Sequence, residues 1–199
     1  MPRKKYYYET GGDTIMQLTP EQMRQVIFKG IDKWEKDNKT NIDKKIVAPN
    51  NRFMKREDIA ETLYSIARME SSFDPQATGE ETSIGNRSHG LFQLNDVHFK
   101  EGGLLSYTDP QSLLTGKEEA QVSAALDIAV AHNSFTPWAT YRLAQGDNPY
   151  SNEPKAQEYM SRSRNRNKAA RQQWSSLFED PNPIGSYEDA FTPRMTRRQ

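Results

Sequence analysis

Apolar residues at helical spacing, Ile59, Leu63 and Ile66, lead directly to an acidic residue, Glu70. At about 100° per residue, all four side chains lie on one face of a helix. The spacing therefore predicts a helix from about Lys55 to Glu70 whose apolar face ends in a carboxylate. Desolvation on that face favours the protonated carboxyl, which in a cleft can donate a proton to a leaving-group oxygen. The alternative is a charge just past the helix end, turned to solvent.

Helical spacing recurs in three other parts of the chain. Thr19-Pro20-Glu21-Gln22 has the form of a capping box with proline at the first helical position. The apolar spacing that follows predicts a helix to about Asp37, in which Trp34 packs in the core. Similar spacing predicts helices at residues 117–131 and 154–178. The chain should therefore be mainly helical.

Turn-forming residues dominate the segments between these helices. Residues 38–54 and 100–117 are expected to be loops. Residues 71–95 contain Asp74-Pro75 and Gly79 among other turn signals, which predict turns and a small irregular hairpin with no long strand.

Two short motifs lie on either side of the turn-rich segment. Glu70-Ser71 stands at the predicted helix end, and Gly90-Leu91-Phe92-Gln93 follows later. Together they resemble the lysozyme-like superfamily, and in particular lytic transglycosylases of the soluble-lytic-transglycosylase (SLT) type, over roughly residues 55–145. The resemblance implies a mainly α, lysozyme-like (α+β) domain with a small, irregular β-hairpin region.

The resemblance also implies an activity, the cleavage of peptidoglycan between N-acetylmuramic acid and N-acetylglucosamine. In that family one glutamate acts first as acid and then as base, and the 6-hydroxyl of muramic acid attacks to leave a 1,6-anhydro end. Glu70 matches this glutamate. Ser71 matches the family serine that orients the glutamate or contacts the sugar, and Gln93 matches the motif glutamine at the cleft.

A third motif departs from the family pattern. Where the family usually has Ala-Tyr-Asn-Ala-Gly, the chain reads Ala131-His132-Asn133-Ser134-Phe135. Further along, Pro137-Trp138 and Tyr141 resemble the Trp-rich version seen in phage cell-wall enzymes. His132, Asn133 and Tyr141 are therefore candidate sugar contacts. Asn133 can equally be a polar group satisfied in the core, and Trp138 is expected to pack in the core rather than to stack on a sugar.

Hydrolysis of a glycoside generally uses a second carboxylate beside the proton donor. The candidates are the acidic residues of the hairpin region, Asp74, Glu80, Glu81 and Asp96. None has a context that singles it out. The lack of a clear second acid favours the transglycosylase route, and a muramidase (hydrolase) stays open as the alternative.

Composition narrows the accessible chemistry. The chain has no cysteine, which excludes a disulfide framework, a thiol nucleophile and a cysteine-based metal site. The three histidines, His89, His98 and His132, show no HxxxH spacing, and we expect neither a metal nor another cofactor. Lys and Arg total 27, as do Asp and Glu, and no nucleic-acid recognition motif is present. Nucleic-acid binding as the main function is therefore not favoured.

The chain has no obvious export or membrane signal. No apolar run reaches transmembrane length, and the basic N-terminal residues are not followed by the apolar stretch of a secretory signal. A cell-wall enzyme must nevertheless reach the periplasm. We therefore expect a phage protein carried in the virion, which opens the host cell wall during genome entry. The alternatives are an endolysin, or a structural virion or tail protein whose inactive lysozyme-like domain only binds glycan.

The expected organisation is an N-terminal arm at residues 1–18, a catalytic domain at 19–150, and a C-terminal helix with an extended tail at 151–199. We expect other virion proteins to hold these arms. A packing patch is expected on the C-terminal helix, at Ala170, Trp174, Leu177 and Phe178.

The C-terminal helix also carries a basic stretch without an acidic residue. Its members are Arg162, Arg164, Arg166, Lys168 and Arg171. The stretch is either a solvated helix face or a contact for an anionic partner.

Overall fold

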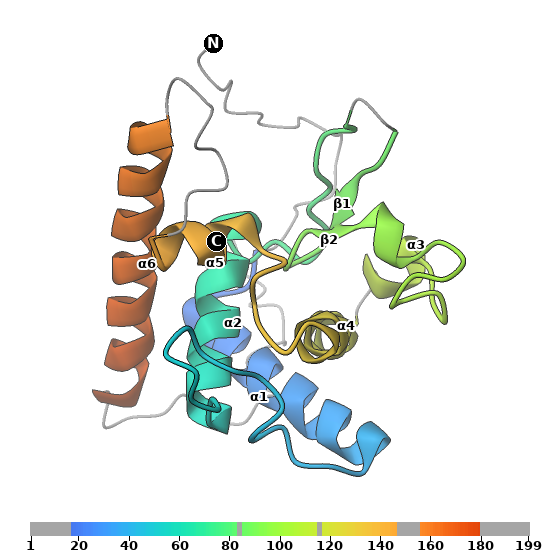
Figure 1. Ribbon diagram of the computed structural model, residues 1–199, viewed down its shortest axis with the longest axis horizontal. Helices are drawn as coiled ribbons and strands as arrows, with labels where there is room; N and C mark the ends of the chain where they lie inside the picture. Colours follow the sequence, from blue (N-terminus) through green and yellow to red (C-terminus); the bar gives the residue numbers. More distant parts are fainter. Residues whose placement is uncertain (1–16, 83–84, 115–116, 147–155, 180–199) are drawn as a thin grey trace, which may run out of the picture.

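The protein, seen as a computed structural model, is mainly helical with one small antiparallel sheet (Figure 1). The structure describes residues 17–82, 85–114, 117–146 and 156–179. Its elements, in chain order, are α1 (Pro20–Asn38), α2 (Arg56–Glu70), β1 (Ser88–His89), β2 (Leu94–Asn95), the 3-10 helix η1 (Asp96–His98), α3 (Pro110–Leu114), α4 (Glu118–Ala131), α5 (Ala139–Ala144) and α6 (Ala156–Glu179). The predicted class, a mainly α domain with a small β-hairpin region, is confirmed.

The start of α1 follows from its capping residues. The Thr19 hydroxyl accepts a hydrogen bond from the Gln22 amide, and the Gln22 side-chain oxygen accepts one from the Thr19 amide. This reciprocal pair satisfies two amides that the helix itself leaves without partners. At the other end Lys39 adopts a left-handed conformation with φ of 51°, which stops the helix. The capping box and the helix predicted from it are both confirmed.

Helix α4 lies at the centre of the helical body and is seen nearly end-on in Figure 1. It packs against α1 at Gly30, where an added Cβ would lie 2.3 Å from Cβ of Val122. The crossing is therefore closer than any side chain larger than hydrogen allows. Nearby, the Trp34 indole donates to a carboxylate oxygen of Asp127 at 2.8 Å. Trp34 is 4% exposed, which confirms its predicted place in the core.

Helix α6 runs beside α2, is contacted by the short helix α5, and adds to the same core (Figure 1). Ala170 and Trp174 are buried, and the Trp174 ring lies 5.2 Å from that of Tyr64 on α2. Leu177 is partly buried against the core. The Phe178 ring is 53% exposed and is covered on one side by the guanidinium of Arg24 at 4.0 Å, so the patch predicted on this helix is buried at only part of its residues.

The hairpin region follows α2 and contains the sheet. Strands β1 and β2 pair with Ser88 opposite Asn95 and His89 opposite Leu94, and Thr78 forms an isolated bridge to His89. Turns make up most of the remaining segment, because glycine, proline and asparagine interrupt any longer strand. The expectation of a small, irregular hairpin is confirmed.

Two short helices lie where helices were not predicted. Helix α3 falls inside the expected 100–117 loop, where the Asp109 side chain accepts from the Ser112 amide at 2.9 Å and so caps its first turn. Helix α5 follows Trp138. Both are shorter than two turns, and such segments are too short for a 3.6-residue apolar repeat to be recognised.

The predicted arms fall mostly outside the described residues. Residues 1–16 and 180–199 are not described, nor is the expected boundary between residues 150 and 151. Leu18, the last residue of the expected N-terminal arm, is buried, and its amide donates to the Phe73 carbonyl at 3.0 Å. The compact body therefore includes at least this part of the arm.

Within the described ranges, none of the helices combines the length and the apolar character that crossing a lipid bilayer requires.

Candidate active site

Glu70 is the last residue of α2, and the helix presents it as its spacing predicts. Ile59, Leu63 and Ile66 are buried on the same face. The Glu70 side chain is itself partly buried, and the hydroxyl of Thr140 on α5 donates a hydrogen bond to its Oε1 at 2.6 Å. The alternative reading, a charge turned to solvent, therefore does not hold.

The electrostatic surroundings favour the protonated form of Glu70. Burial raises the pKa of its carboxyl above the ordinary value, and the hydrogen bond from Thr140 offsets part of this rise. Its place at the helix C-terminus acts in the same direction as burial, because the partial negative charge of the last carbonyls disfavours a carboxylate. Among the described residues, no cation forms an ion pair with Glu70. A carboxyl held in this way can donate a proton near neutral pH.

Ser71 ties the end of α2 to the hairpin region. Its Oγ lies 3.0 Å from the Ala67 carbonyl and 3.0 Å from the Leu91 carbonyl. The Ser71 hydroxyl therefore donates its hydrogen bond to these carbonyls. Ser71 therefore fixes the main chain beside Glu70 and forms no hydrogen bond with the Glu70 carboxyl itself.

The first residue of the Gly-Leu-Phe-Gln motif lies so close to Gln121 on α4 that there is no room for a side chain. Gly90 has a φ of +72°, and an added Cβ would lie 2.2 Å from Oε1 of Gln121. That oxygen accepts from the Leu91 amide at 2.8 Å, while the Gln121 amide nitrogen donates to the carbonyls of Pro75 and Leu113. One buried amide thus holds three chain segments around the site. Only glycine fits both the backbone angle and the space.

Gln93, the last residue of the motif, is partly buried and has a φ of 49°. Its side-chain nitrogen lies 3.2 Å from the Ala77 carbonyl and 3.1 Å from the Gly90 carbonyl. Its amide hydrogens therefore hold the hairpin region together. A sugar contact by Gln93 remains a prediction.

Trp138 connects the hairpin region to α5. Its indole nitrogen donates to the Phe92 carbonyl at 2.8 Å, and its side chain is 6% exposed. The ring packs against Phe135 with centroids 5.9 Å apart. This confirms the core-packing interpretation of Trp138 over a stacking contact with a sugar.

The three weaker candidates for sugar contacts lie in different surroundings. His132 and Asn133 follow the end of α4 and are exposed, and Asn133 has a φ of 51°. The interpretation of Asn133 as a core polar group is therefore wrong, because its side chain is at the surface. Tyr141 is 5% exposed on α5 and packs on Phe135. Burial raises the pKa of the Tyr141 hydroxyl, and its position favours packing over sugar contact.

His132 lies near a histidine of the hairpin region. Burial lowers the pKa of His98, and the charge of His132 lowers it further.

Acidic side chains of the hairpin region already have local partners. Asp74 accepts from the Gln76 amide at 2.9 Å, and Glu81 pairs with Arg87. Glu80 is exposed. None of these three is hydrogen-bonded to Glu70 in the part of the chain that the structure describes.

Asp96 is the most constrained of these acids. Its Oδ1 lies 2.7 Å from Nε2 of His89, and its Oδ2 accepts from the Arg87 amide at 2.7 Å. Although burial acts to raise it, these hydrogen bonds hold the pKa of Asp96 below its ordinary value. Asp96 is therefore ionised at neutral pH and oriented by the hairpin.

Thr140 and Gln121 were not found from the sequence. Thr140 meets Glu70 across 70 positions of chain, and no local pattern reports such a contact. Gln121 gave a weak signal, since it is a lone amide at the start of the apolar run of α4. The described residues bring together no group of three or more His, Asp or Glu side chains that could hold a metal ion.

The family model of the transglycosylase SLT domain matches residues 46–126. This segment is a transglycosylase SLT domain. The SLT domain includes α2 with Glu70, the whole hairpin region, and most of α4. Helices α1, α5 and α6, and with them Thr140, lie outside the matched residues. A search among curated proteins finds no match to the chain.

An SLT domain implies peptidoglycan as the substrate and degradation of the lytic transglycosylase type.

Proposed function

We propose that the protein is a peptidoglycan lytic transglycosylase in which Glu70 is the catalytic acid and base. Protonated Glu70 donates its proton to the glycosidic oxygen between N-acetylmuramic acid and N-acetylglucosamine, and the C–O bond breaks. The resulting carboxylate then accepts the proton of the 6-hydroxyl of muramic acid as that oxygen attacks the anomeric carbon. The carboxyl is regenerated and no water is consumed.

The observation that carries the proposal is the environment of Glu70. Within the described part of the chain, this carboxyl has a raised pKa, a hydroxyl partner and no paired cation, which suits proton donation first and proton abstraction second. The Thr140 hydrogen bond supports both steps, because a hydroxyl can donate to either form of the carboxyl.

The transglycosylase route is favoured over hydrolysis by the surroundings of the other acids. Asp74 and Glu81 are engaged in the hairpin region, and Glu80 is exposed. If the enzyme were a muramidase, Asp96 would be the candidate second carboxylate, since it is ionised at neutral pH. It is already bound by His89 and by the Arg87 amide.

The test is mass spectrometry of the products released from purified peptidoglycan by wild type and by Glu70→Gln. Anhydromuramoyl ends that are absent with the variant are the expected result. Reducing muramic ends from the wild type would replace the proposal with a muramidase, and Asp96→Asn would then be the next variant. A folded wild type that releases no product would favour a glycan-binding structural protein.

We further propose that the enzyme is carried in a phage virion and acts on the host cell wall during genome entry. The support is the sequence Pro137-Trp138 with Tyr141, which resembles phage cell-wall enzymes, together with the polar composition of the terminal segments. Mass spectrometry of purified virions tests the proposal. Detection of the protein only in lysates, and never in virions, would favour an endolysin.

A further inference from the structure

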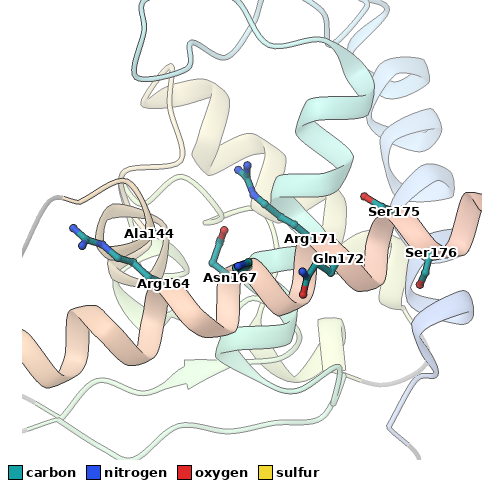
Figure 2. A pocket seen from close by; sticks show the side chains of 8 residues that line it. Ala144, Arg164, Asn167, Arg171, Gln172, Ser175 and Ser176 are labelled. Carbon is teal, nitrogen blue, oxygen red and sulfur yellow. The ribbon is translucent and has the colours of Figure 1, made fainter.

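An open pocket of about 500 Å³ lies along α6, outside the residues that match the SLT domain. Figure 2 shows its lining side chains, which all come from α6 except Ala144 of α5. The α6 residues are all polar or cationic: Arg164, Asn167, Lys168, Arg171, Gln172, Ser175 and Ser176. None of the described lining residues carries a carboxylate, so this lining attracts an anion.

Three cations form a row in this pocket. Arg164, Lys168 and Arg171 recur at positions i, i+4 and i+7, which places them on one helix face over about 10 Å of the axis. All three are exposed. Arg171 Nε lies 3.4 Å from a carboxylate oxygen of Glu61 on α2, which offsets part of its charge. Arg164 and Lys168 form no ion pair with the described residues, so they are the two pocket cations whose charge is not offset in this way.

The pocket borders α5, the helix whose Thr140 donates a hydrogen bond to Glu70. An amino group of the Arg164 guanidinium lies 3.4 Å from the position that a Cβ on Gly146 would take, just past α5. Ala144 is one helical turn, or about 6 Å, along α5 from Thr140. Thr140 in turn donates to the Glu70 carboxyl. The pocket and the Glu70 carboxyl are therefore both bordered by α5.

We propose that this pocket binds the carboxylate-bearing peptide of a peptidoglycan strand whose glycan lies at Glu70. The proposal rests on the proposed glycan cleavage. Arginine pairs with a carboxylate through two parallel hydrogen bonds, and lysine adds a point charge. The amide and hydroxyl side chains beside them match the N–H and C=O groups of a peptide. Four extended residues span up to about 14 Å, so such a peptide extends well beyond the sugar that carries it.

A nucleic acid fits the same pocket less well. Single strands bind through positive grooves in which aromatic side chains stack on bases, and none of the lining residues is aromatic. Duplexes bind through many phosphate contacts, whereas only two cations of the pocket, Arg164 and Lys168, have no ion pair among the described residues.

The first experiment compares two double variants of α6 that remove the same charge. Arg164→Gln with Lys168→Gln empties the pocket of its unpaired cations. Arg162→Gln with Arg166→Gln is the matched control, because these residues lie roughly 160° around the helix and line no part of the pocket. Each is assayed on peptide-bearing glycan strands and on the same strands after an amidase has removed the peptides.

The pocket variant should raise KM for peptide-bearing strands about fivefold to tenfold, with kcat unchanged and peptide-free strands cleaved as by the wild type. The control variant should match the wild type on both substrates. An equal loss on both substrates, or an equal loss in the control, overturns the proposal. So does a lowered melting temperature with unchanged KM, since the cations would then only stabilise the end of α5.

A second measurement needs no catalysis. The Glu70→Gln protein is titrated calorimetrically with a soluble muropeptide that bears an acidic tetrapeptide, with and without the two pocket substitutions. Binding that weakens with the substitutions and with added salt supports the proposal. Binding unaffected by the substitutions overturns it, as does preferential binding of a single-stranded oligonucleotide. If the wild type cleaves neither strand type, the proposed activity fails, and this titration alone decides whether the peptide binds.

Discussion

The two ends of α2 differ in whether their ionisable side chains are paired with an opposite charge. At the N-terminal end, the Arg56 guanidinium pairs with the carboxylates of Asp32 and Glu35, and its amide donates to Asp43. At the C-terminal end, Glu70 is partly buried and its carboxyl is hydrogen-bonded to a neutral hydroxyl, that of Thr140. One helix therefore carries a neutralised charge at its first residue and a carboxyl without a paired cation at its last.

The difference indicates which end serves stability and which serves chemistry. A partly buried charge that meets opposite charges is stabilised by them, and the carboxylates near Arg56 also complement the positive end of the helix dipole. A buried carboxyl without a cation stabilises the fold only while it is protonated. Buried carboxyls that destabilise the fold when ionised are common at active sites, where a shifted pKa serves catalysis.

Neutral hydrogen bonds alone position the C-terminal end. Ser71 donates toward the Leu91 carbonyl, and Gln121 accepts from the Leu91 amide. These bonds fix the main chain around Glu70 without placing a charge beside it. The hairpin region can thus be rigid next to the carboxyl and still leave its pKa raised.

The largest expected effect separates the two ends by activity. Glu70→Gln should lower glycan cleavage by about 10²–10⁴-fold, the usual contribution of a general acid, whereas Arg56→Gln should leave kcat within about twofold of wild type in the same product assay. Equal losses of activity in the two variants would contradict the division of roles along α2.

Next in size is the loss of the neutral support at Gln121. Gln121→Leu leaves the Leu91 amide and the carbonyls of Pro75 and Leu113 without their buried partner. We expect a decrease of about 3 kcal/mol or more in the free energy of unfolding, measured in urea. Gln111→Leu on α3, an exposed position, is the control and should change little. A loss below about 1 kcal/mol at Gln121 would mean that the hairpin region is held by other contacts.

The ion pairs at the N-terminal end should contribute less. Arg56→Gln should lower the free energy of unfolding by about 1–2 kcal/mol, since the guanidinium is only partly exposed while one partner, Asp32, is largely in solvent. The loss should shrink in 1 M salt, because screening weakens the wild-type pairs. The loss in Gln121→Leu should not shrink in this way, and a similar salt response in both variants would remove the contrast.

A smaller effect concerns stability against pH at Glu70. Burial raises the pKa of this carboxyl in the folded state, so the contribution of the protonated side chain is fully present below the unfolded pKa and is lost as pH rises through the folded one. The stability of Glu70→Gln relative to wild type should therefore increase over that window. Thermal melts of both proteins from pH 4 to pH 9 measure it. A stability difference between the two proteins that does not change with pH would show that the Glu70 carboxyl is not desolvated.

The smallest effect is expected at Thr140. Thr140→Val removes the hydrogen bond that offsets the rise in the pKa of Glu70, so the alkaline limb of the pH–kcat profile should move to higher pH. Thr140→Ser keeps a hydroxyl and should restore the wild-type limb. A Thr140→Val enzyme with an unmoved limb and lower kcat would instead indicate that the hydroxyl acts only by orienting the carboxyl.

The sequence predicts α2 and its terminal glutamate well because the signal is local. Ile59, Leu63 and Ile66 repeat at the helical period, and a carboxylate at the same period is readable without any knowledge of the fold. The start of α1 was equally accessible, since Thr19 and Gln22 are three residues apart.

What surrounds Glu70 could not be read in this way. Thr140 lies on α5, too short for a periodic pattern, and reaches Glu70 only through the packing of α5 on α2. The sequence spacing would place Asn133 on the apolar face of α4 if the helix continued to that residue. The helix ends at Ala131, however, and the left-handed backbone at Asn133 turns the side chain to the surface. Element ends and contacts between distant segments are therefore the parts that needed coordinates.

The three tryptophans of the chain stand at three different junctions of the molecule. Trp34 meets α4 through Asp127, Trp138 meets the hairpin region through the Phe92 carbonyl, and Trp174 meets Tyr64 on α2. Variants that each retain a single indole would give three separate fluorescence signals. During refolding these would time the closure of the α1–α4 pair, the docking of the hairpin region and the arrival of α6 as distinct events.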